Sequence, residues 1–105
     1  MAAVSLANGS YPHVKNITLA GVGDTMQEIE VPGNCRRCEI VFTSAAGKLI
    51  TDGTDATVIS TEESFPIPAD SAFYVDISRA SGNFSLYLAS ATPSTVVSVI
   101  VTDGD

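Results

Sequence analysis

The chain has 105 residues, of which 45% are apolar and 16% are charged, and this length is typical of one domain with a single core. The apolar content excludes intrinsic disorder, and no apolar run reaches the roughly 18 residues that a membrane-spanning helix needs. Twelve acidic and five basic residues give a formal net charge of −7. This excludes nucleic acid as the main partner, because phosphate binding needs a surface rich in Lys and Arg.

The first dozen residues are expected to form an N-terminal arm. Residues 1–12 end in Tyr11-Pro12, and proline resists joining the interior of a sheet. The folded domain is predicted over residues 13–102, and residues 103–105 are expected to form a short acidic tail.

Short segments of alternating apolar and polar residues run along this domain. Ile17 and Leu19 share one face of the first segment, and Cys38, Ile40 and Phe42 share one face of a later segment. A period of two is typical of half-buried strands, and turn residues separate the segments at intervals of roughly 8–12 residues. The pattern predicts an all-β fold, either a small antiparallel β-sandwich or a jelly-roll-like barrel of about seven or eight short strands.

A β-hairpin is predicted over residues 72–89. A four-residue loop at residues 79–82 would bring three apolar pairs together on the inner face: Phe73 with Leu88, Val75 with Leu86, and Ile77 with Phe84. The same register would place Tyr74 beside Tyr87 on the outer face. Such a pair can stabilise a hairpin or form a contact surface, and both roles are open.

Arg36 and Arg37 are two of the five basic residues and lie together after a turn at residues 32–34. On an acidic chain they are the natural place to meet an acidic surface of a partner. The alternative is an ion pair within the chain, either with Glu30 across a second hairpin at that turn or with Glu39.

The last predicted strand, residues 95–102, is apolar on both faces. Three valines form one face, and Val96 and Ile100 lie on the other. A strand of this kind is expected to be covered on both faces. The arm could cover the second face through Val4 and Leu6, or a neighbouring subunit could do so. Alternatively, the two side chains simply lie exposed, as single apolar residues often do.

Cys35-Arg-Arg-Cys38 has the spacing of a redox or metal motif. A redox motif needs a helix after the first cysteine, whereas this pair follows a turn and enters a strand. A structural zinc site needs four ligands, and His13 is the only histidine. We therefore expect one buried and one rim cysteine, with no metal and no cofactor. A single histidine does not provide the combination of nucleophile, general base and orienting acid that an active site needs. We therefore expect no enzymatic activity.

In this order, the segments resemble the small all-β virion proteins of tailed bacteriophages, especially head decoration (cement) proteins. The resemblance covers roughly residues 13–102 and rests on five segments: HVKNITLA at 13–20, RRCEIVF at 36–42, FPIPA at 65–69 before FYVDI at 73–77, FSLYL at 84–88 and VVSVIV at 96–101. It implies a non-enzymatic structural protein on the outer capsid surface. Its partners would be the major capsid protein or other virion subunits and copies of itself, with no nucleic acid and no membrane.

The contact surface is expected to involve nine residues: Val4, Leu6, Tyr11, Arg36, Arg37, Tyr74, Tyr87, Val96 and Ile100. The alternative function is a carbohydrate- or receptor-binding β-sandwich module, as in adhesins and tail tips. Because the chain has no tryptophan, such a module would have to stack sugars on its three tyrosines.

Overall fold

The computed structural model describes residues 3–6, 12–33, 35–76 and 83–103. Within these ranges the chain forms nine strands: β1 (Val4–Ser5), β2 (His13–Thr18), β3 (Gln27–Val31), β4 (Cys35–Thr43), β5 (Gly47–Ile50), β6 (Ser64–Ile67), β7 (Ala72–Asp76), β8 (Phe84–Ala89) and β9 (Val96–Asp103). The last strand therefore includes Asp103, the first residue of the predicted acidic tail.

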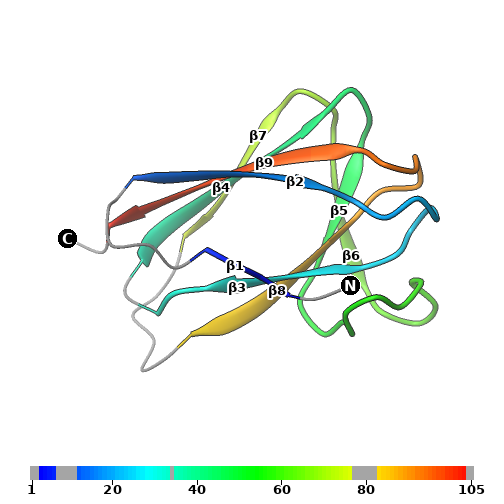
Figure 1. Ribbon diagram of the computed structural model, residues 1–105, viewed down its shortest axis with the longest axis horizontal. Helices are drawn as coiled ribbons and strands as arrows, with labels where there is room; N and C mark the ends of the chain where they lie inside the picture. The colour runs from blue at the N-terminus through cyan, green and yellow to red at the C-terminus, as the bar shows by residue number, and fades with distance from the viewer. Residues whose placement is uncertain (1–2, 7–11, 34, 77–82, 104–105) are drawn as a thin grey trace.

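The strands form two sheets that face each other. The first sheet has the order β1-β3-β8-β5-β6, and the second has the order β2-β9-β4-β7. Figure 1 shows β2, β9 and β4 in one layer and β1, β3 and β8 in the other. From β2 onward, every connection except β5–β6 passes from one sheet to the other. This strand order is that of a jelly roll, so the prediction of an all-β sandwich is confirmed.

The predicted hairpin over residues 72–89 is wrong. β7 pairs with β4 in the second sheet, whereas β8 lies between β3 and β5 in the first sheet. Tyr74 is therefore opposite Glu39, and Tyr87 is opposite Glu28 and Ile50, on different sheets. Ile77 and the expected loop at 79–82 lie outside the described residues.

The predicted second hairpin, around residues 32–34, is wrong for the same reason. β3 pairs with β1 and β8, and β4 pairs with β7 and β9. Glu30 is opposite Ser85 instead of Arg37. The alternation of side chains identified the inner faces correctly, but a jelly roll sends successive strands to opposite sheets.

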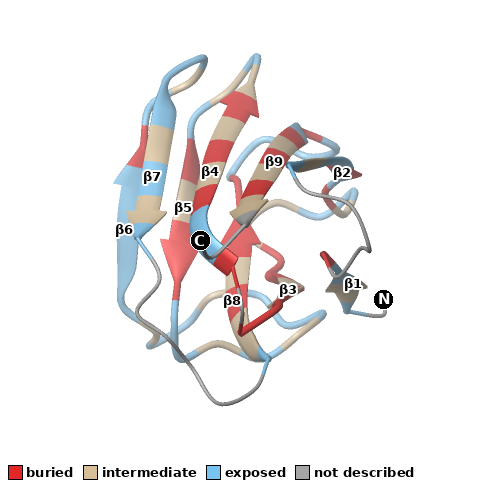
Figure 2. Cartoon of the chain, turned by 90° about the vertical axis from the view of Figure 1, so that its left-hand side faces the viewer, coloured by how far each residue is buried: buried red, intermediate tan, exposed pale blue. Residues whose placement is uncertain are grey.

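The core fills the space between the sheets. Buried and part-buried residues alternate along β4 and β9, as Figure 2 shows. Phe42 is the largest fully buried side chain. Its ring packs directly against Gly47, whose side chain is only a hydrogen atom. A Cβ atom at Gly47 would lie 2.0 Å from that ring, so this close approach requires glycine.

The N-terminal segment contributes to the first sheet. Val4 and Ser5 pair in parallel with Ile29 and Glu30, and the Leu6 amide donates a 2.9 Å hydrogen bond to the Glu30 carbonyl. Leu6 is fully buried in the core, and Val4 packs against the core. The expectation that these two residues cover the second face of β9 is therefore wrong, because they pack with the opposite sheet.

Leu6→Ala should lower the free energy of unfolding by about 2–5 kcal/mol, because it leaves a cavity in the core. The measurement is urea denaturation followed by circular dichroism. Val22→Ala is the control, since Val22 is 65% exposed and its truncation should change stability by less than about 0.5 kcal/mol. Equal midpoints for the two variants would contradict the docked position of Leu6.

Candidate functional site

No described segment of the chain covers the outer face of the second sheet. The register sets its outward side chains in three rows across β2, β9, β4 and β7: Val14, Ile100, Glu39 and Tyr74; Asn16, Ser98, Val41 and Ala72; and Thr18, Val96 and Thr43. Arg37 and Asp76 continue this face beyond the first row. We call this set the outer face.

Apolar side chains on the outer face are open to solvent. Val14 is 57% exposed, Tyr74 is 52% exposed and Val96 is 37% exposed, and Val41 and Ile100 are partly buried. Three of the six large apolar side chains that are exposed in the described residues therefore lie on this one face. Apolar side chains that gather on one face of a sheet mark interaction sites more often than single scattered ones do.

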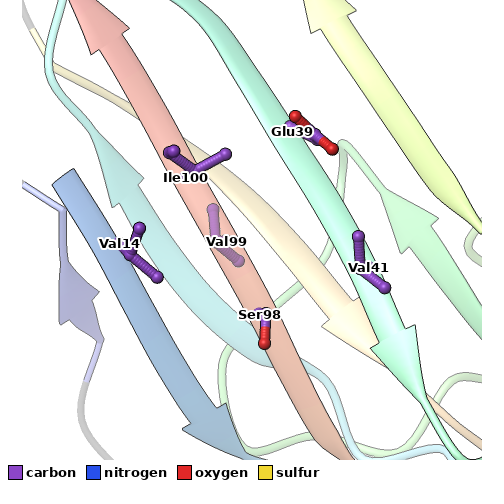
Figure 3. A pocket seen from close by; sticks show the side chains of 6 residues that line it. All are labelled: Val14, Glu39, Val41, Ser98, Val99 and Ile100. Atoms are coloured by element: carbon purple, nitrogen blue, oxygen red, sulfur yellow. The ribbon is translucent and has the colours of Figure 1, made fainter. Parts of the chain in front are cut away.

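A shallow hollow of about 260 Å³ lies in the middle of the outer face. Its lining comes from β2, β9 and β4: Val14, Ser98, Val99, Ile100, Glu39 and Val41 (Figure 3). Ser98 is the smallest of these residues. Its hydroxyl donates a 2.8 Å hydrogen bond to Asn16 Oδ1. A small side chain between larger neighbours leaves room for a group from outside.

The charge of Arg37 is compensated within the chain. Its Nε donates to Asp76 Oδ1 at 2.9 Å, and its guanidinium carbon lies 5.0 Å from the centre of the Tyr74 ring. The partner is therefore Asp76, and not Glu30 or Glu39 as the sequence suggested. Arg36 is exposed at a register shift in β4 between Cys35 and Arg37.

The outer side of the first sheet is different, because part of the chain covers it. A second apolar cluster forms there from Met26, Ile50 and Ala89, with Ile59 and Tyr87 packed against them. The Met26 amide donates a 2.9 Å hydrogen bond to the Thr57 carbonyl, which ties the covering segment to the sheet. Tyr87 therefore contributes to this cluster and not to the outer face.

The structure brings together four of the nine residues predicted for the contact surface: Arg37, Tyr74, Val96 and Ile100. Leu6 is unavailable at the surface because it lies in the core, and Val4 and Tyr87 pack against apolar clusters. Tyr11 lies outside the described residues.

Three residues of the outer face were not predicted from the sequence: Val14, Glu39 and Val41. Their outward direction follows from alternation with the buried Ile17, Cys38 and Ile40. Their position beside β9 required the strand order, which alternation alone does not contain.

Both cysteines are buried and neither forms a disulfide bond, so the expectation of one rim cysteine is wrong. The register shift at Arg36 turns Cys35 and Cys38 to the same side of β4, although residues three apart on a regular strand point to opposite faces. Burial, and to a lesser degree the neighbouring Cys35, raises the pKa of Cys38 to about 12.

The described residues contain no cluster of side chains that could form a metal site. Among them, no three His, Cys, Asp or Glu residues are placed to hold a metal ion. The same residues include no helix that is long and apolar enough to cross a membrane.

No protein-family model, curated protein or solved structure matches this chain.

The Cys38 thiol should make stability fall at alkaline pH. Its pKa is about 12 in the folded protein, and an unfolded cysteine titrates near 8.5, so only the unfolded state loses the proton between these values. The free energy of unfolding should be unaffected by this group below about pH 8.5 and should fall as pH rises towards 12.

Urea denaturation of wild type and Cys38→Ala at neutral and alkaline pH checks this prediction. Wild type should lose more stability than the variant on going from neutral to alkaline pH. The variant is the control for tyrosine and lysine titration, which both proteins share. Equal losses would contradict the shifted pKa.

Proposed function

We propose that this protein is a non-enzymatic structural component of a virion. In this proposal it is a decoration protein that binds the outer surface of a capsid and stabilises the shell. It docks through the outer face of the second sheet.

The observation that carries the docking proposal is the outer face, which no described segment covers and which exposes Val14, Tyr74 and Val96. It lies on the two inner strands of the sheet, β9 and β4, and extends over both edge strands, β2 and β7. An exposed tyrosine and an arginine flank its apolar centre, and these residue types are enriched at protein interfaces. Part of the opposite sheet is covered by the chain itself, where Ile59 and Tyr87 pack against Met26, Ile50 and Ala89.

Three further observations support a capsid as the partner. The sequence resembles phage decoration proteins over roughly residues 13–102, and jelly rolls are common among viral capsid domains. The net charge of −7 suits the outside of a shell better than an interior lined with nucleic acid. A partner that binds only the folded state also stabilises the fold by mass action.

Ile100→Glu should abolish docking, because it buries a charge at the centre of the contact. The test uses purified capsids that lack this protein, with sedimentation to measure binding and heating to measure shell stability. Wild type should co-sediment with the capsids and raise the temperature at which they open.

Val22→Glu is the matched control, because Val22 is exposed on a loop outside the outer face. Circular dichroism establishes that both variants fold. If Ile100→Glu bound capsids as tightly as Val22→Glu, the outer face would not be the docking surface. Failure of wild type to bind would remove the capsid proposal itself.

Carbohydrate binding is the second candidate, and exposed Tyr74 is the observation in its favour. Its ring is opposite Glu39 in the register, and aromatic rings beside polar groups can stack on sugars. The lining of the adjacent hollow is mostly apolar, which favours protein docking over a hydroxyl-rich ligand. A glycan array with wild type and Tyr74→Ala separates the two functions. Specific glycan binding that is lost in the variant would favour this candidate.

A further inference from the structure

We propose that the hollow on the outer face receives a Lys or Arg side chain from the docking partner, with Glu39 as its counter-ion. This inference deepens the proposed docking function and rests on it. It names the type of side chain that the partner places at the centre of the outer face.

Glu39 is an uncompensated charge within an apolar surface. It lies on β4, an inner strand of the sheet, with Ile100 and Tyr74 as its neighbours across the register. It is partly buried, and its side chain makes no hydrogen bond or ion pair with the described residues. The basic residue of the same face, Arg37, is paired with Asp76.

The hollow is large enough for one long basic side chain, and its lining suits one. Its volume of about 260 Å³ is below the roughly 300–1,000 Å³ of sites for drug-sized ligands. Val14, Val41 and Ile100 provide apolar walls, and Figure 3 shows Glu39 on the same side of the sheet. Lys and Arg combine an aliphatic stem with a charged end, so the stem can lie along the walls while the cation reaches the carboxylate.

Docking makes a cation at this position necessary. A partner that covers the outer face removes water from the Glu39 carboxylate, and an unpaired buried charge is strongly unfavourable. A charge-assisted hydrogen bond from Lys or Arg compensates for this loss.

A second copy of the chain is a poor occupant of the same hollow. Two outer faces packed on each other would bring two Glu39 carboxylates into one interface, where each Arg37 is already paired with Asp76. Each copy also carries a formal charge of −7, which opposes association. Charge complementarity therefore favours a partner with a basic side chain.

The first experiment measures capsid binding by Glu39→Gln, which keeps the shape of the side chain and removes its charge. Binding should weaken about tenfold and become less sensitive to salt, because a charge-assisted contact is lost. Glu63→Gln is the matched control, since it removes an exposed carboxylate outside the outer face and should bind within about twofold of wild type.

The outcomes separate this inference from the docking proposal. If Ile100→Glu abolishes binding and Glu39→Gln binds like wild type, docking stands and the basic occupant is wrong. A dimer that forms with concentration, measured by light scattering and lost in Ile100→Glu, would instead identify a second copy as the occupant and overturn the inference.

The second experiment needs no capsid. N-acetyl-arginine methylamide and its neutral isostere N-acetyl-citrulline methylamide are titrated into labelled protein, and NMR follows the methyl groups of Val14, Val41 and Ile100. The arginine probe should shift these signals at millimolar concentration, and Glu39→Gln should remove the effect. Equal responses to the two probes, or no response to the arginine probe, would overturn the inference.

Discussion

The burial of one face of β9 determines the arrangement of the second sheet. Val97, Val99 and Val101 are buried against the core, and β9 pairs with β2 over six residue pairs and with β4 over eight. A shift of one residue would expose all three valines, so the register is strongly specified. The same constraint turns Val96 and Ile100 outward. The candidate docking surface is therefore a geometric consequence of the core.

Alternation along the sequence indicates the direction of most side chains but not the partners of each strand. Alternation predicted the inner face of β8 and the outward positions of Tyr74 and Ile100, because a period of two is a local property. The hairpins failed because most successive strands pass to opposite sheets, so the pairing depends on distant segments. The register shift at Arg36 escaped prediction as well, and it turned Cys35 inward.

The two outer surfaces of the sandwich illustrate how strand order decides which side chains come together in a candidate site. Tyr74 and Tyr87 look equivalent in the sequence, since each is flanked by apolar residues of a strand. In the structure, Tyr87 packs against the cluster that covers the first sheet, whereas Tyr74 lies open beside Glu39. A candidate site therefore emerges only after the strands are placed in order. Val14, from a strand far away in the chain, then completes it.

The central position of β9 also constrains the order of events during synthesis. Among the described strands, β2 has only β9 as a hydrogen-bonded neighbour, although almost the whole domain separates the two along the chain. A ribosome must therefore translate through β9 before the second sheet can close. Until then β2 has no paired neighbour among the described strands and β4 is unpaired along one side, which favours slow folding and aggregation of incomplete chains. The second sheet therefore forms only after the last described strand has been synthesised.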